Sequence, residues 1–306
     1  MKLNVLIRIV IIVSLFPAAQ LAYSQGCSDA GFCTIRDLRP HTDRSQSIKN
    51  NNRIQFSVSH GSADHGIAVT GGHVEYGRMV NENIRFDIKV SFTMQRGVSL
   101  RRTGLSDVFL SSSYTSTGSN SFTLGLKVPL SDGNAIVNGS SLPMDLQSSL
   151  GTYDLILGFG TTVEQVQFTA AVQMPLVQNN NRFFAEQHPA DSELRKFTTT
   201  NEYQRKADVL MRISYPIHLG TGLVLTPSIL PIYHTADDEY TALNGTVQTI
   251  TGSKGLTLNL NMYMTYVLDP SQKIELNFGS PLRTRTVRPD GLTRGYVAAL
   301  EYQTTF

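Results

Sequence analysis

From about residue 53 to its end, the chain alternates apolar and polar residues with a period of two. In IRFDIKVSFTMQ (84–95), every second side chain from Ile84 to Met94 is apolar, and the side chains between them are charged or polar. A helix would scatter these charges through its apolar stripe, whereas a strand keeps them on one face. The segments 121–130 and 255–268 repeat the pattern. The chain is therefore predicted to be built from amphipathic strands.

Twelve such strands are expected, and the connections between them are unequal in length. The expected strands are 53–61, 69–80, 84–96, 105–116, 121–130, 152–162, 166–176, 204–218, 223–234, 256–268, 273–282 and 295–306. Short connections such as NEN (81–83) and GTG (220–222) alternate along the chain with longer ones such as 177–203. Short turns on one side and long loops on the other are typical of outer-membrane β-barrels.

The predicted fold class is all-β: a twelve-stranded antiparallel transmembrane β-barrel of the outer-membrane type. Strands of about ten residues, tilted by about 45°, cover the roughly 25 Å apolar band of an outer membrane. A soluble β-sandwich would not need one face of nearly every strand to be this apolar. The expected location is the bacterial outer membrane, with its lipids and lipopolysaccharide around the barrel.

The first residues have the composition of an export signal. Lys2 begins a short basic region, an apolar run follows up to Phe16, and Ala22 and Ser24 offer the small side chains that a signal peptidase reads. We therefore expect a signal peptide at 1–24, an N-terminal segment at 25–52 and the barrel at 53–306. The segment 25–52 either lies in the periplasm or enters the lumen as a partial plug.

Removal of the signal changes the net charge of the chain and leaves a pair of cysteines near the new N-terminus. Without Lys2 and Arg8, 24 basic residues stand against 24 acidic ones, so no basic field remains to recruit nucleic acid. An oxidising compartment favours a disulfide between Cys27 and Cys33. The alternative is a lipidated Cys27, although the leucine expected three residues upstream is missing. No metal or cofactor is expected, since no second Cys or His pair has zinc-like spacing.

Three glycine-rich stretches suggest a family. GLSDVFLSSSY (104–114), FTLGLKVPLSDGN (122–134) and GTYDLILGFG (151–160) resemble strands of the outer-membrane proteins grouped with phenol meta-pathway degradation. Those proteins are similar in size and are regarded as twelve-stranded transport barrels. The resemblance covers roughly the middle third of the chain. It implies passive uptake of small, often aromatic compounds, and it brings no catalytic residues.

The last residues, GYVAALEYQTTF, form a regular strand that stops without a polar tail. The ends of soluble domains usually fray into water, so such a strand needs a neighbour, as the closing strand of a barrel has. The ending EYQTTF resembles the signal that the barrel-assembly machinery reads in outer-membrane proteins. This resemblance implies that Tyr302 and Phe306 form the assembly signal.

The polar faces of the strands carry charges of both signs that are expected to point inward. The predicted lumen-lining residues are Arg85, Asp87, Lys89, Asp107, Lys127, Asp154, Lys206, Asp208, Arg212, Glu275 and Glu301. Single buried charges are costly, so these side chains lie in water or pair across the lumen. Arg85, Asp87 and Lys89 lie on one strand about 6.6–6.8 Å apart in succession. Their partners are therefore expected on neighbouring strands, with Asp107 and Lys127 as candidates.

The stretch SVSHGSADHG (57–66) gives the best sign of catalysis. Alternation places His60 and Ser62 on the lipid-facing side, where a membrane-embedded hydrolase would need a histidine-activated serine. The following strand offers no acid on that face, which disfavours a hydrolase. His60, His65 and His73 could instead gather at a hairpin tip around a metal ion, a weaker hypothesis.

Taken together, these patterns predict a monomeric passive channel or transporter for small apolar or aromatic molecules, with a hydrated path through the lumen. A lumen filled by mutually paired charges fits the same residues. Two other functions stay open: a lipid-modifying hydrolase built on His60 and Ser62, and a structural or surface-interaction barrel that works through its long loops. The acidic run at 237–239 is expected in a solvated loop, near cations held by lipopolysaccharide phosphates.

Overall fold

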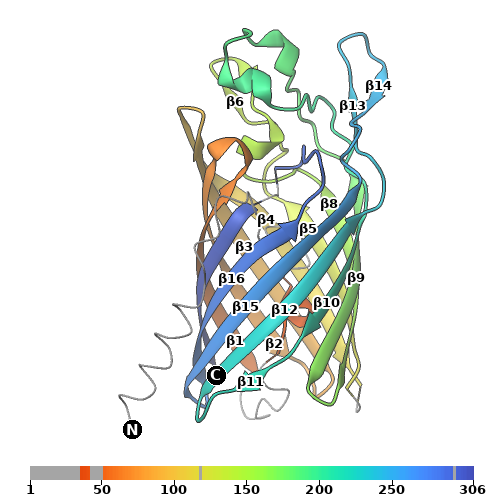
Figure 1. Ribbon diagram of the computed structural model, residues 1–306. Coiled ribbons are helices and arrows are strands. Elements are labelled where there is room, and N and C mark those ends of the chain that lie inside the picture. The colour runs from red at the N-terminus through yellow and green to blue at the C-terminus, as the bar shows by residue number, and fades with distance from the viewer. Residues whose placement is uncertain (1–34, 42–50, 117–118, 292–293) are drawn as a thin grey trace.

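The computed structural model describes residues 35–41, 51–116, 119–291 and 294–306, which form a closed antiparallel β-barrel (Figure 1). The wall strands are β1 (Asn52–Ala63), β2 (Ala68–Met79), β3 (Ile84–Gly97), β4 (Leu100–Thr115), β5 (Ser121–Pro129), β8 (Tyr153–Val163), β9 (Val166–Val177), β10 (Asp208–Ser214), β12 (Leu223–His234), β15 (Gly255–Asp269), β16 (Gln272–Arg283) and β17 (Arg294–Thr305). Each wall strand pairs with the next, and β1 pairs with β17, so the sheet closes. The predicted all-β, twelve-stranded barrel is confirmed.

Side chains alternate between the outer and inner faces of the wall as the period of two requires. On β3, Phe86, Ile88 and Val90 are 52%, 42% and 38% exposed, whereas Asp87 and Lys89 are 8% and 3% exposed. The other wall strands also carry exposed apolar side chains on their outer faces. Such a surface, with every backbone group paired inside a closed sheet, is suited to a lipid bilayer.

The two ends of the barrel differ (Figure 1). Short turns and the C-terminus lie at one end, and the long loops lie at the other. The long loops hold the hairpin of β6 (Ile136–Val137) and β7 (Ser140–Ser141), the 3-10 turns η3 (Met144–Leu146), η4 (Ala185–Gln187) and η5 (Glu193–Lys196), and the hairpin of β13 (Glu239–Thr241) and β14 (Val247–Thr249). By the usual orientation of outer-membrane barrels, the long loops are extracellular and the short turns periplasmic.

The first two extracellular connections are shorter than predicted. β1 and β2 are joined through η2 (Asp64–Gly66), and β3 and β4 are joined by Val98 and Ser99 alone. Val98 and Ser99 have φ values of 54° and 58°, the left-handed conformation that two-residue hairpin turns need. Glycine, asparagine or aspartate normally marks such a turn. None of them occupies either position, so no typical turn residue marks this hairpin in the sequence.

The eighth predicted strand, 204–218, was too long. β10 covers only Asp208–Ser214, and the two-residue β11 (Ile217–His218) continues it beyond Pro216. Proline has no N–H to give to the ladder, which explains the interruption. At the other end, Gln204 leaves the wall and pairs with Glu239 in an extracellular loop. Lys206, expected in the lumen, lies in this loop region and pairs with Glu239 at 2.7 Å.

The extracellular loops pack on one another through apolar side chains. Leu142, Leu146, Phe183 and Phe197 come from two different loops and form one buried cluster with Ile67, which follows η2. We call these loops the cap. Residues 35–41, with the 3-10 turn η1 (Arg36–Leu38), lie inside the barrel against its wall. Among the described residues, no helix is long and apolar enough to cross a membrane.

Candidate functional site in the barrel lumen

Residues 35–41 fill one side of the lumen with apolar side chains. Ile35 and Leu38 are 2% and 1% exposed. They pack against inward-facing wall residues, namely Phe109, Ile156, Ala171, Leu210 and Leu230. These wall residues come from β4, β8, β9, β10 and β12. This side of the lumen is therefore a small hydrophobic core, shared between the wall and the N-terminal segment.

Two wall glycines make room for this segment. A Cβ atom on Gly125 of β5 would collide with the side chain of Ile35, and one on Gly158 of β8 would collide with that of Leu38. Both glycines belong to the stretches that resemble the phenol meta-pathway group, FTLGLKVPLSDGN and GTYDLILGFG. Glycine in a strand interior often marks such a close approach.

Polar contacts attach the same segment to β9, β16 and β17 of the wall. The guanidinium of Arg39 donates to Glu301 at 3.0 and 2.9 Å and also pairs with Glu275. The backbone N–H of His41 donates to Gln167 at 3.0 Å, and the Gln167 amide donates back to the carbonyl of His41 at 2.6 Å. The pairs of Arg39 with the two glutamates are charge-assisted, and such pairs are among the stronger hydrogen bonds in proteins.

Further contacts hold the turn η1. Arg212 donates to the carbonyl oxygen of Leu38, and Ser113 donates to the carboxylate of Asp37. Arg85 lies 3.6 Å from Asp37. Among the predicted lumen-lining residues, Arg85, Arg212, Glu275 and Glu301 thus bind the N-terminal segment.

A second network of buried charges connects β1, β2 and β3. Arg53 pairs with Glu75 and, at 2.7 Å, with Asp87. Lys89 Nζ lies 3.1 Å from the Glu75 carboxylate. Arg53 and Asp87 flank Gly77 on β2, and both side chains lie where a Cβ on Gly77 would be. Because Gly77 has no side chain, Arg53 reaches Asp87 across β2.

The expected partners of the β3 charges were therefore wrong. Lys127 pairs with Asp154 at 2.9 Å and donates to Thr152 at 2.8 Å. Lys127 and Asp154 stand directly opposite each other on β5 and β8 and are 1% and 0% exposed. Asp107 accepts a hydrogen bond from Ser149 at 2.7 Å. Direct opposition across antiparallel strands decided the Lys127–Asp154 and Lys89–Glu75 pairs, and a spacing along one strand does not reveal it.

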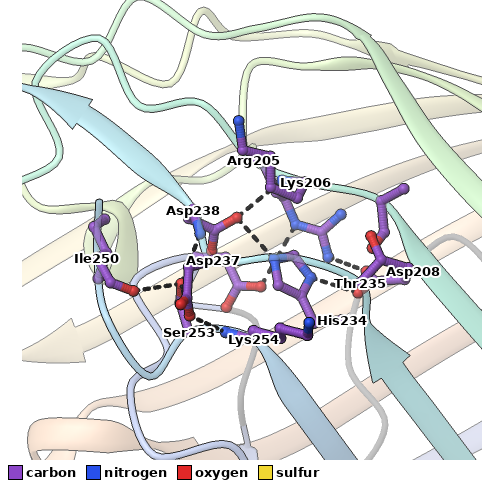
Figure 2. A network of polar contacts seen from close by, with 12 residues as sticks. Arg205, Lys206, Asp208, His234, Thr235, Asp237, Asp238, Ile250, Ser253 and Lys254 are labelled. Carbon is purple, nitrogen blue, oxygen red and sulfur yellow. Dashed lines mark hydrogen bonds and ion pairs between the residues drawn. The ribbon is translucent and has the colours of Figure 1, made fainter. Parts of the chain in front are cut away.

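A third network joins the extracellular rim of the barrel to the cap (Figure 2). His234 at the end of β12 is hydrogen-bonded to Asp208 at 2.7 Å through Nδ1 and to Asp238 at 2.8 Å through Nε2. Asp208 also pairs with Arg205. Asp238 is 0% exposed and accepts from Tyr203 Oη at 2.7 Å.

The acidic run 237–239 is therefore not a solvated loop, as had been expected. Asp238 lies in the buried network, and Asp237 organises the following turn by accepting from the N–H groups of Gly252 at 3.1 Å and Lys254 at 2.7 Å. The hydrogen bond from the Lys254 N–H, helped by that from Gly252, lowers the pKa of Asp237 against the opposing effect of burial. Glu239 pairs with Lys206. All three acidic side chains hold the cap together.

The side of the lumen away from Ile35 and Leu38 contains a cavity. A cavity of about 130 Å³ lies against β1–β4 and β15–β17 and reaches Arg39 of the N-terminal segment. Small inward residues leave this space; they include Ser57, Ser59, Gly61, Gly71, Ser91, Gly279 and Ala299. The cavity also touches the charged side chains of Lys89 and Glu301. The lumen is thus filled on one side and holds a cavity on the other.

Some functional residues were missed by sequence reasoning. Arg53 shares the inward phase of its strand, because Ile54 and Phe56 alternate with it, so a stricter count would have found it. Arg39 and His41 lie outside any strand, and no periodic signal marks them. His234 stands at the end of β12, where the alternation stops, and Arg205 lies in the loop before β10.

The hydrolase candidates are not arranged as a catalytic pair. His60 is exposed on the outer face, and its Nδ1 is hydrogen-bonded to Thr70, its cross-strand neighbour, at 2.9 Å. Its bonded hydroxyl is therefore that of Thr70 and not that of Ser62. His65 stacks on Phe197 in the cap, with ring centroids 4.3 Å apart. The three histidines do not gather, and no group of metal-ligating side chains occurs among the described residues.

The C-terminal residues complete the seam of the barrel. Phe306 exchanges backbone hydrogen bonds with Asn52, at 2.9 and 3.0 Å, and its side chain is 60% exposed. Tyr302 lies on the outer face, and its hydroxyl donates to Gln272 at 2.7 Å. The signal peptide at 1–24 and the Cys27–Cys33 disulfide lie outside the described residues.

Comparisons with known proteins bear on the fold. Neither a protein-family model nor a curated protein matches the sequence. The structure is similar to the COG4313 outer membrane channel from Pseudomonas putida F1, with a TM-score of 0.60 and 11% identity over 88% of this chain and 100% of that one. The CymD monoaromatic hydrocarbon channel has a TM-score of 0.42 at 7% identity, covering 94% of this chain and 95% of that one. The protein is an outer-membrane β-barrel by fold.

Proposed function

We propose that this protein is a passive, monomeric channel for small apolar or aromatic molecules, and that residues 35–41 act as a partial plug. The observation that carries the proposal is the division of the lumen. Ile35 and Leu38 fill one side, while small side chains leave a cavity of about 130 Å³ on the other. A barrel with a purely structural role would gain stability by filling that space with apolar side chains.

The choice of solute rests on two features. The cavity combines polar groups with the aromatic rings of Phe109 and Tyr263, which suits small molecules that carry a ring. The resemblance of 104–114, 122–134 and 151–160 to the phenol meta-pathway group supports the same class of solute. The named channels of similar fold fit this proposal.

The plug is proposed to narrow the path. Arg39 pairs with Glu301 and Glu275, and Glu301 itself lines the cavity. A solute that travels down the side with the cavity therefore meets the Arg39–Glu301 pair. Lys89 lies on the facing wall. The charge of Lys89 should influence which ions pass, because a fixed charge in a narrow pore with low-dielectric walls attracts its counter-ions.

Replacing Lys89 with glutamate tests the channel proposal. The purified parent should conduct ions in a planar bilayer and admit small aromatic solutes into liposomes. Lys89→Glu should shift the reversal potential toward cation selectivity, because it replaces a positive charge with a negative one at one point of the path. Ile88→Leu on the lipid-facing side is the matched control and should leave selectivity unchanged. If the folded parent passes neither ions nor aromatic solutes, the lumen is closed and a surface or structural role is preferred.

A further inference from the structure

Three side chains around the lumen cavity carry nitrogen atoms whose hydrogen-bonding capacity the described residues leave partly or wholly unused. Asn261 on β15 is 4% exposed, and its side-chain Nδ2 has no partner within the described part of the chain. Nε2 of His73 on β2, which is a donor in one of the two tautomers of the ring, also has no partner among the described residues. Lys89 on β3 is 3% exposed; its Nζ pairs with Glu75 at 3.1 Å, which leaves the other two of its three N–H donors for a further acceptor. All three side chains line the same cavity.

Buried polar groups in native proteins are nearly always hydrogen-bonded, so three such nitrogens around one cavity need an explanation. A misplaced single group would be an isolated defect. A set that comes from three strands and faces one space is instead what a binding site for an acceptor-bearing ligand needs.

The acidic side chains of the cavity are already engaged. Glu301 accepts from Arg39, from Gln55 at 2.7 Å and from Asn277 at 3.1 Å. Asp107 accepts from Ser149 at 2.7 Å. The unused hydrogen-bonding capacity of the cavity is therefore concentrated on donors. A ligand that completes it must supply oxygen acceptors, and a negative charge would suit the ammonium of Lys89.

The other residues that line the cavity favour a ligand with an aromatic ring. Phe109 and Tyr263 present aromatic rings, and Gly71 and Gly279 keep the space beside them free of side chains. Flat ring systems pack well on such surfaces. A volume of about 130 Å³ suits a single ring better than a larger scaffold.

We propose that this cavity is a binding subsite for a small aromatic carboxylate. The carboxylate accepts hydrogen bonds from Lys89 Nζ and Asn261 Nδ2, and the ring lies against Phe109 and Tyr263. The inference rests on the proposed channel function, since a solute must reach the cavity through the lumen. It goes beyond that function because it assigns the charge of the solute and the residues that hold it.

Binding of 4-fluorobenzoate to the folded full-length barrel in detergent, followed by fluorine NMR, tests the proposal. We expect saturable binding of 4-fluorobenzoate and clearly weaker binding of its neutral relative, 4-fluorobenzyl alcohol. Lys89→Met keeps the length of the side chain but removes the charge, and should weaken binding of the acid by about tenfold or more. Asn261→Ala should weaken it by about threefold or more without touching any ion pair.

The controls separate a damaged fold from a lost site. Heat-modifiable migration on gels reports whether each variant is a closed barrel, and Ile88→Leu on the lipid-facing side should bind like the parent. Equal binding of acid and alcohol, or unchanged binding to a folded Lys89→Met or Asn261→Ala variant, overturns the subsite. A parent that conducts ions but shows no saturable binding overturns the subsite alone. A parent that binds the acid but passes no solute overturns only the channel.

Discussion

At Gly158 the N-terminal segment lies directly against the backbone of the wall. Leu38 occupies the space that a side chain at this position would fill, and Gly125 makes the same room for Ile35. Each glycine costs strand stability, roughly 0.5–1 kcal/mol relative to alanine. The apolar contacts of Ile35 and Leu38 with the wall offset this cost. The two glycines are therefore part of the binding surface for the plug.

Gly158→Val should expel the plug from its place. The added side chain overlaps Leu38, and overpacking of this kind costs about 1–3 kcal/mol, which is enough to favour an arrangement with Leu38 displaced. We expect a higher single-channel conductance in planar bilayers than that of the parent. Gly160→Ala lies on the same strand and face, where the added Cβ meets the Ser121 hydroxyl instead of the plug. Equal conductance of parent and folded Gly158→Val would show that the plug does not limit the pore.

At the scale of single residues, the alternation predicted correctly which charges leave the lipid face. Asp87 and Lys89 are inward and buried, as the period of two requires. Their partners could not be predicted, because pairing depends on register between strands. Glu75 stands opposite Lys89, and the small Gly77 lets Arg53 reach Asp87. Neither fact is visible until the strands are aligned.

At the scale of elements, the seam between β1 and β17 decides whether the barrel closes. The register runs without a break from Arg53–Thr305 to Ser62–Tyr296, and Phe306 adds backbone hydrogen bonds to Asn52. An unpaired edge in lipid would leave its N–H and C=O groups unsatisfied. Pairing of the first strand with the last is therefore what satisfies these groups at the seam.

Deleting Phe306, or replacing it with Asp, should leave the chain exported but unclosed in the periplasm. The exposed aromatic ring at the end of the last strand has the position that the resemblance to an assembly signal requires. Heat-modifiable migration on gels would report barrel closure. Tyr302→Phe keeps an aromatic ring on the same outer face and should close normally. Normal closure of both Phe306 variants would contradict an assembly role for this residue.

The sequence predicted the middles of the strands, where the ladder of hydrogen bonds is regular, better than it predicted their ends. The expected strand 84–96 agrees closely with β3 (Ile84–Gly97). The expected strand 204–218 fails because Pro216 interrupts the ladder and Gln204 pairs within the cap. Hydrophobic periodicity reports burial of a face. It does not report which loop competes for the last residues of a strand.

At the scale of the whole molecule, ion pairs connect loops that are distant in sequence. Arg288 in the last loop donates two hydrogen bonds to Asp64 in the first, at 2.8 and 2.7 Å. Asp290 pairs with Arg285 at 2.8 Å, and Arg205 from another loop lies 3.5 Å from it. The cap is thus one unit in which every long loop contributes. The sequence predicts the loops but not the contacts between them, because the residues that meet share no local pattern.

The cap should loosen in acid through Asp290. Burial alone would raise the pKa of this carboxyl, but Arg285 and Arg205 outweigh it and hold the pKa well below its usual value. Because the pKa of Asp290 is lower in the folded cap than in an unfolded chain, where it is about 4, its ionisation stabilises the folded cap at pH values above about 4. This stabilisation is lost as the pH falls toward the pKa of the folded cap. Hydrogen exchange in the loops 178–207 and 235–254, corrected for intrinsic rates, should therefore be faster at pH 3 than at pH 7.

Asp290→Asn should show fast exchange already at pH 7, whereas Glu193→Gln, which breaks an exposed pair with Lys196, should behave like the parent. Exchange in Asp290→Asn that matches the parent at both pH values would mean that other groups hold the cap closed.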